Sequence, residues 1–285
     1  MQEFAIILIN LLILVFVLTS MFGTGLGLTI SQILDPLRDL RAVVLALLAN
    51  FILVPALAVG IASVLGLDAG YRTGLIVIAC AAGAPFLPKL AQVARGNLAF
   101  SVGLMILLMV VTVVYAPIVL PLLIPGVAVS PWDIARPLIM LMLIPLGIGL
   151  FVRSWQPETA ASLAPIMGNA SSYSLLAAAV LGLLVGFQSL MGAFGTGAFI
   201  AAALLVAGAI AIGYFLTTGG KENKSIGALG AGQRNISAAL LIASTNFTDP
   251  TVILMVLVVS VVGMGLLFLV AGVFGKRAEA VVAGK

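Results

Sequence analysis

Residues 78–96 read IACAAGAPFLPKLAQVARG, and residues 225–244 read SIGALGAGQRNISAALLIAS. Both stretches are apolar enough to cross a membrane, but prolines interrupt the first, and clustered glycines lead into three polar residues in the second. Proline removes a helical hydrogen bond and glycine loosens a helix, so each stretch is expected to break near its middle. Glycine and proline are also common in membrane helices generally, so the meaning of the two breaks depends on where they lie.

The composition excludes a water-soluble fold. Of the 285 residues, 63% are hydrophobic and 8% are charged, and the mean hydropathy is +1.32. A soluble domain has about 45–50% apolar and about 25% charged residues. The chain contains no histidine and a single cysteine, Cys80, which excludes a histidine metal site, a Ser-His-Asp triad and an intrachain disulfide. We therefore expect an integral membrane protein whose main partner is the lipid bilayer.

Charges and turn residues divide the chain into segments of about 20 or more apolar residues, the length needed to cross a bilayer. The expected fold is an all-α polytopic membrane protein with about nine transmembrane helices, all in a single domain over residues 1–285. The first is expected to be retained, because no basic region precedes it as in a cleavable signal. The predicted spans are 4–30, 42–66, 69–95, 98–125, 136–154, 162–187, 197–219, 225–246 and 250–275.

The two interrupted spans occupy equivalent places in the chain. Each is the penultimate member of a set of four spans, namely spans one to four and spans six to nine. Equivalent members are five positions apart in the order of spans, which is an odd number. The two sets therefore have opposite orientations, which predicts two inverted repeats. Discontinuous helices at corresponding positions of inverted halves are the best sequence indication of a secondary transporter's binding site.

The basic residues are distributed unevenly between the two predicted sides. Two of the thirteen lie inside spans, Arg72 and Arg136 lie on one side, and nine lie on the other. The positive-inside rule predicts an outside N-terminus and a cytoplasmic C-terminus, in a cell (inner) membrane. The nine are Arg38, Arg41, Arg95, Arg153, Lys221, Lys224, Lys276, Arg277 and Lys285.

Arg234 is the most unusual residue in a predicted span. It lies about ten residues from either end, about 15 Å from each surface at 1.5 Å per residue. A charge at that depth costs at least about 2.5–3.5 kcal/mol, and none of the acidic residues falls inside a span to neutralise it. Its partner is expected to be a bound anion, backbone carbonyls or water. We favour anion binding over a purely structural role in which the arginine bridges carbonyls.

Lys89 is a second candidate, because it follows Pro88 in the other broken span. It either points toward the same central region, where it would be the one protonatable group, or extends to the nearby surface. Further polar residues lie within spans, and any one of them could simply hold helices together. The candidates for lining a substrate cavity are Asn50, Ser101, Gln233, Asn235, Asn169, Ser172 and Tyr173.

The chain carries no signature of an enzyme. Gly220 and Lys221 are followed by Glu222, so no phosphate-binding loop is present. No pair of carboxylates lies within the spans for acid–base chemistry. We therefore expect no catalytic residue, cofactor or metal. We also expect no nucleic-acid partner, because the basic residues flank the membrane helices.

Four stretches of this sequence resemble the bile acid:sodium symporter family. They are FGTGLGLTISQ (22–32), the segment 50–55, ARGNLAFSV (94–102) and GQRNISAALLIAS (232–244). The resemblance implies inverted repeats whose broken helices cross at the substrate and ion sites. It also implies a core (42–125 and 197–275) that moves against a panel (4–30 and 136–187). Family substrates are organic anions, from bile acids to small carboxylates such as pyruvate or pantoate.

The sequence departs from the family where sodium ligands are expected. The resemblance implies a Ser-Asn pair where this chain has Leu87 and Pro88, and an acid and a glutamine where it has Gly230 and Arg234. Oxygen ligands are thus lost in the two spans that gain the cations Lys89 and Arg234. We hypothesise that these cations replace bound sodium.

The expected function is therefore a secondary transporter of organic anions that works by alternating access without sodium. Two alternatives remain open. One is a sodium-coupled organic-anion symporter with rearranged ligands. The other is a non-transporting membrane sensor on a carrier scaffold.

Overall fold

A computed structural model describes residues 2–29, 31, 39–124 and 131–283 of the chain, and every regular element in these ranges is a helix. The elements are α1 (Gln2–Gly27), α3 (Leu40–Leu48), the π-helical turn η2 (Ala49–Leu53), α4 (Val54–Val64), α5 (Ala69–Cys80), α6 (Leu87–Ala94), α7 (Leu98–Leu123), α8 (Pro131–Leu138), the π-helical turn η3 (Ile139–Leu143), α9 (Ile144–Trp155), α10 (Pro157–Ala193), α11 (Ala198–Leu216), α12 (Lys221–Gly232), α13 (Ile236–Asn246) and α14 (Pro250–Ala283).

Seven helices in the described residues are long and apolar enough to cross a bilayer. They are Ile7–Gly27, Leu40–Val64, Leu98–Leu123, Pro131–Trp155, Pro157–Gly182, Ala198–Leu216 and Pro250–Ala280. The other two predicted spans, 69–95 and 225–246, are the pairs α5–α6 and α12–α13, each interrupted near its middle as predicted. The chain is thus an all-helical polytopic membrane protein. The total of nine spans and the inverted repeats remain predictions.

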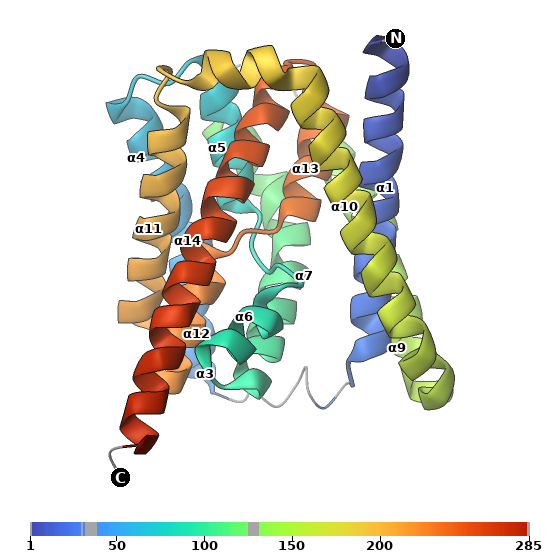
Figure 1. Cartoon of the computed structure of the whole chain (residues 1–285), viewed down its shortest axis with the longest axis vertical. Coiled ribbons are helices and arrows are strands. Elements are labelled where there is room, and N and C mark those ends of the chain that lie inside the picture. Colours follow the sequence, from blue (N-terminus) through green and yellow to red (C-terminus); the bar gives the residue numbers. More distant parts are fainter. Residues whose placement is uncertain (1, 30, 32–38, 125–130, 284–285) are drawn as a thin grey trace.

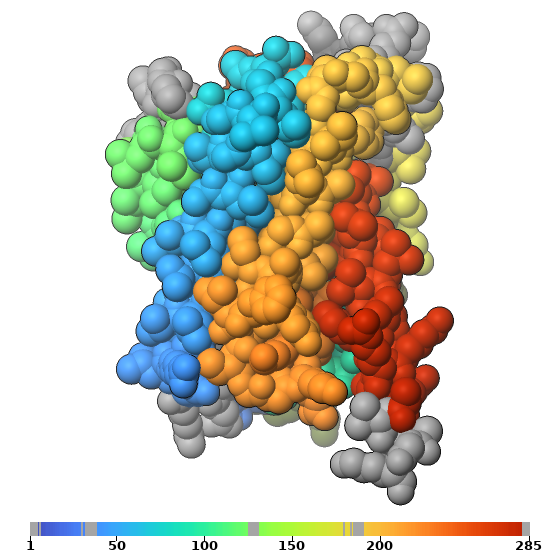
Figure 2. All heavy atoms as spheres, turned by 90° about the vertical axis from the view of Figure 1, so that its left-hand side faces the viewer, coloured from blue at the N-terminus to red at the C-terminus, as the bar shows by residue number. Residues whose placement is uncertain are grey.

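The helices form two groups with the interrupted helices between them (Figure 1). Helix α1 packs mainly against α9 and α10 on one side of the molecule. On the opposite face, α11 lies between α4 and α14 (Figure 2). Helices α5, α6 and α12 pack against α7 and α14, and α13 packs against α1, α8 and α14, which places both breaks inside the protein. The breaks are therefore sheltered from lipid, as irregular backbone at membrane depth must be.

The basic residues gather toward one end of the molecule. Helices α3, α6 and α12 lie toward the end at which α14 finishes (Figure 1). Arg95, which follows α6, forms an ion pair with Glu279 in the last turns of α14. Arg38 and Lys285 lie outside the described residues. The assignment of this end to the cytoplasm remains a prediction.

Two glycines bring α1 and α9 into backbone contact. A Cβ atom on Gly25 of α1 would overlap the carbonyl oxygen of Leu146, and one on Gly149 of α9 would overlap that of Phe22. Between membrane helices, small residues favour association because they let the backbones approach closely. The α1–α9 contact therefore depends on the missing side chains.

Replacing Gly149 by alanine should separate α1 from α9 and lower the melting temperature of the purified protein by several degrees. Gly147→Ala is the matched control, because a Cβ there meets nothing within 4 Å and alanine favours the helix. Thermal unfolding in detergent measures both variants. Equal melting temperatures for the two would contradict this account of the contact.

Candidate functional site

The two breaks lie against each other. The backbone N–H of Asn235, in the second break, donates to the carbonyl of Ala81 in the first at 2.8 Å. The Asn235 side chain donates from Nδ2 to the carbonyl of Gly83 at 2.9 Å, and its Oδ1 accepts from the N–H of Ala238 at 3.1 Å. One fully buried asparagine thus joins the breaks and caps α13.

Helix α7 fixes the shape of the first break. The Thr112 hydroxyl accepts from the N–H of Ala82 and donates to its carbonyl, both at 3.0 Å. Gly83 has a φ of +78°, and a Cβ there would overlap the backbone nitrogen of Met109. Thr112 was not singled out from the sequence, because a lone threonine in an apolar helix gives no signal of its role.

Arg234 is 4% exposed, and its guanidinium directs all its hydrogen bonds at oxygen atoms of the protein. Nε donates to the carbonyl of Ile78 at 3.3 Å, and one terminal nitrogen donates to the carbonyl of Ala79. The same nitrogen donates to the carbonyl of Asn50 at 3.3 Å. The other donates to Oδ1 of Asn50 at 2.9 Å and to the carbonyl of Ala231 at 3.1 Å. A guanidinium has five N–H donors, so this set uses all of them.

The positive charge lies at the C-terminal ends of two half-helices. Ile78 and Ala79 belong to the last turn of α5, and Ala231 to the last turn of α12. Carbonyl groups at a helix C-terminus carry partial negative charge, so they stabilise a cation without any carboxylate. The sequence favours anion binding for Arg234. The structure shows that the arginine bridges carbonyls of the broken helices, and a contact between Arg234 and an anion stays a prediction.

Asn50 lies in the π-helical turn η2, where it is 2% exposed. Its Oδ1 and its carbonyl both accept from Arg234, and its Nδ2 donates to the carbonyl of Ala46 at 3.0 Å. A π-helical turn releases backbone carbonyls from the usual ladder, which is why such turns often occur at functional sites. The turn therefore brings the second span into the arginine's set of acceptors.

A cavity of about 530 Å³ lies between the breaks and the helices α1 and α10. We call it the central cavity. Hydroxyl groups and apolar side chains share its wall, and Gln233 and Arg234 also reach it. Its hydroxyl-bearing residues are Thr19, Ser20, Thr24, Ser171, Ser172 and Ser237, and its larger apolar ones are Phe16, Pro85, Phe86, Leu175, Leu176, Ile236 and Met264.

The N-terminus of α13 opens into the central cavity. Ile236 and Ser237 line it, and within the described residues their backbone N–H groups and the Ser237 hydroxyl have no hydrogen-bond partner. The start of α6 differs, because the N–H groups of Leu87 and Lys89 donate to local carbonyls and Pro88 has none. Free N–H groups at a helix N-terminus attract anions. Of the two half-helices that begin at the breaks, α13 therefore offers free donors at its N-terminus and α6 does not.

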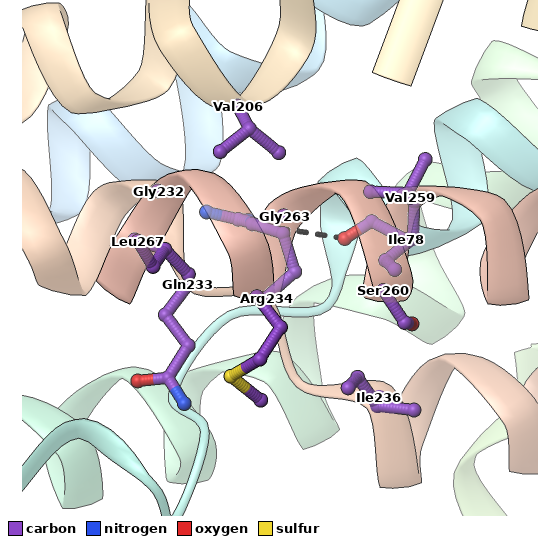
Figure 3. Close-up of a pocket in the computed structure, with 11 residues that line it drawn as sticks. Ile78, Val206, Gly232, Gln233, Arg234, Ile236, Val259, Ser260, Gly263 and Leu267 are labelled. Atoms are coloured by element: carbon purple, nitrogen blue, oxygen red, sulfur yellow. Dashed lines mark hydrogen bonds between the residues drawn. The ribbon is translucent and has the colours of Figure 1, made fainter. Parts of the chain in front are cut away.

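Gln233 is 5% exposed, and its Oε1 has no hydrogen-bond partner among the described residues. Its side chain also borders a second, smaller cavity beside Arg234 and Ser260 (Figure 3). This space of about 20 Å³ is large enough for one water molecule.

Four further predicted site residues do not line the central cavity. Lys89 is exposed on α6, with its ammonium 5.4 Å from the centre of the Phe86 ring, so it does not share the position of Arg234. Ser101 is buried on α7, where it donates to the carbonyl of Leu98. Asn169 and Tyr173 are exposed on α10 and do not line the central cavity.

The structure adds Thr19, Ser20 and Thr24 to the candidate residues, because all three line the central cavity. Ser172, which was predicted, lies opposite them on α10 and donates to the carbonyl of Gly168 at 2.9 Å. Their spacing could have indicated this position, because Ser20 and Thr24 are four residues apart and therefore share one face of a helix.

Comparison with known proteins identifies relatives along most of the chain. The model of the sodium bile acid symporter family matches residues 12–193. A probable sodium/metabolite cotransporter, BASS2 of rice chloroplasts (Oryza sativa subsp. japonica), is 28% identical over 81% of this chain and 56% of its own length. The uncharacterised sodium-dependent transporter YocS of Bacillus subtilis is 28% identical over 60% of this chain and 54% of its own. The chain spans about half the length of the curated relatives it matches.

Lysine at position 234 should keep the charge but destabilise the fold. An ammonium has three donors, so at least two of the five bonds are lost, at about 1.5 kcal/mol or more each. We expect Arg234→Lys to lower the free energy of unfolding by about 3 kcal/mol, measured by denaturant titration in detergent. Arg153→Lys is the control, since Arg153 makes only one exposed bond, to Pro157. A change at 234 no larger than that at 153 would show that the five bonds contribute little.

Proposed function

The chain belongs to the sodium bile acid symporter family, and from this premise we propose that it is a secondary transporter of organic anions that works by alternating access without sodium. The membership itself makes the chain an integral membrane protein of a transporter family. The ion requirement and the substrate class are inferred from the residues at the breaks.

The observation that carries the proposal is the position of the Arg234 guanidinium. Unwound carbonyls and the C-terminal ends of half-helices are the groups that hold sodium in transporters with broken helices. In this chain three half-helix carbonyls and two oxygens of Asn50 are already bonded to a cation that cannot leave. A sodium ion about 4 Å away would be repelled by about 4 kcal/mol at an effective dielectric constant of about 20.

In the proposal, Arg234 alone replaces bound sodium. Lys89 bonds none of the five oxygens, but its exposed ammonium lies over Phe86, and Phe86 lines the central cavity. An exposed cation near a cavity raises the local concentration of anions and so speeds their entry. Lys89 is therefore assigned to attracting the substrate rather than to replacing sodium.

The central cavity supports an organic anion as the substrate class. Its volume of about 530 Å³ lies within the range of about 300–1,000 Å³ that is typical of small-molecule sites. The free N–H groups of Ile236 and Ser237 suit a carboxylate, while Phe16, Leu175 and Met264 suit an apolar body. The Arg234 guanidinium adds positive potential to the cavity, although all its hydrogen bonds are made to the protein.

A sodium-coupled symporter is the second candidate. The names of two relatives, a probable sodium/metabolite cotransporter and a sodium-dependent transporter, favour it. Sodium would then bind to oxygens other than those that Arg234 occupies.

Ligand binding should be equal in sodium and in choline. We would measure the melting temperature of the purified protein with pyruvate, pantoate or a bile acid, in each salt at equal ionic strength. A ligand at 100 times its dissociation constant adds about 2.7 kcal/mol, which raises the melting temperature visibly. Stabilisation in sodium alone would favour the second candidate. If none of the anions stabilised the protein in either salt, the non-transporting sensor would be favoured.

Removing the Ser237 hydroxyl should weaken binding of whichever anion stabilises the protein. A hydrogen bond to a charged group contributes about 1.5–3 kcal/mol, so Ser237→Ala should raise the dissociation constant about tenfold or more. Ser162→Ala is the matched control, because Ser162 is exposed and outside the cavity. Isothermal titration measures both, and equal constants for the two variants would remove the Ser237 hydroxyl from the site.

A further inference from the structure

Besides the central cavity, another large cavity is lined by α1 and α10. It has a volume of about 420 Å³ and is enclosed by α1, α10, α13 and α14. Its wall includes Asn10 of α1 and the loop residues Thr248 and Asp249, which connect α13 to α14. These residues are exposed, so the cavity reaches the surface at the end of the molecule where α1 begins. We call it the outer vestibule, a name that marks its place beyond the central cavity.

The central cavity extends toward the opposite end. On α1 it is lined from Phe16 to Thr24, whereas the outer vestibule is lined from Ile9 to Ile13. The two cavities therefore follow one another along α1, with no overlap between their α1 residues.

The layer between the two cavities is about one helical turn thick. On α1, Phe16 faces the central cavity and Ile13 the vestibule; on α13, Ser237 and Leu240 do the same. Both pairs are three residues apart, which corresponds to about 4.5 Å along a helix. On α10 a single residue, Leu175, lines both cavities.

The side chains in this layer are apolar. We define the septum as Ile13, Phe16, Leu175 and Leu240, of which Ile13 is 5%, Phe16 8% and Leu240 1% exposed. Within the described residues the septum has no charged member. An anion cannot enter such a layer without losing its hydration, which is costly.

We propose that the septum is the gate of the transport path and that the outer vestibule is the passage on its far side. This inference rests on the proposed transport function. A shift of about one helical turn of α1 and α10 against α13 would join the two cavities, and displacements of that size between packed helices are an established way of switching. The gate is a single layer, so one side chain should control it.

The vestibule is suited to passage rather than to a second binding site for an anion. Asp249 is the one charged residue in its described wall, and its Oδ1 accepts from the N–H and hydroxyl of Thr251. The carbonyl-bearing C-terminal end of α13 also lies there, whereas its N-terminal donors lie in the central cavity. An anion that crosses the septum therefore moves from a positive to a negative environment and is released.

Cysteine labelling tests the gate without any substrate. Asn10→Cys places a thiol in the vestibule and Thr24→Cys places one in the central cavity. Both would be treated with a membrane-impermeant, anionic methanethiosulfonate in right-side-out and inside-out vesicles. The wild type serves as the blank, because its cysteine, Cys80, is fully buried. We expect each introduced thiol to react from one face of the membrane, and the two from opposite faces.

Leu175→Ala in the Thr24→Cys background should then open a route through the septum, from the outer vestibule to the central cavity. We expect the thiol introduced at position 24 to be labelled at least tenfold faster from the vestibule's face. Leu176→Ala is the matched control, because Leu176 lines the central cavity alone and should leave that rate unchanged. Melting temperatures within a few degrees of the parent verify that both variants are folded.

Two results would overturn the proposal. One is that both thiols react from the same face, which would mean that no barrier lies between the cavities. The other is that Leu175→Ala changes the rate no more than Leu176→Ala does. Neither result depends on anion binding, so a failure of the proposed function in the melting experiments is distinguishable from a failure of the gate.

Discussion

The interior of this protein depends on one buried cation, Arg234, whose hydrogen-bond partners in the described part of the chain are all uncharged oxygens. Placing a charge at the centre of a bilayer costs about 2.5–3.5 kcal/mol or more, and a hydrogen bond to a charged group returns about 1.5–3 kcal/mol. Two or three of the five bonds made by Arg234 therefore offset the cost, provided that their acceptors are held in place. This requirement explains why α5 and α12 end where they do: at that depth free carbonyls come from helix ends and from irregular turns such as the one at Asn50.

The remaining contacts at the centre serve to keep those acceptors fixed. Asn235 joins the two breaks, Thr112 holds the first break to α7, and the π-helical turn at Asn50 supplies two oxygens from a third segment. Gly83 allows the chain to pass α7 closely enough for this arrangement. These segments are far apart in the sequence, so the arginine ties together helices that no local interaction would bring into contact.

Helix α13 connects this centre to the proposed transport path. Its N-terminus, capped by Asn235, points its free N–H groups into the central cavity, and its C-terminus borders the outer vestibule. The same short helix thus offers an anion a favourable end and an unfavourable one, with the apolar septum between them. In the proposed transport cycle, a fixed cation at the breaks would keep this polarity constant, whereas a dissociating ion would change it.

The class of the protein, the two broken helices and the importance of Arg234 could be predicted from the chain alone. Each of these follows from composition, helix-breaking residues or the cost of a buried charge, and these are properties of a residue and its near neighbours. The atoms that Arg234 bonds could not be predicted, because its acceptor Asn50 is 184 residues away and is reached only through packing. The tertiary structure also turned Lys89 outward, gave Thr112 its role and brought Thr19, Ser20 and Thr24 to the cavity. Which face of a helix meets a cavity depends on how the other helices pack around it, and no local pattern in the chain contains that information.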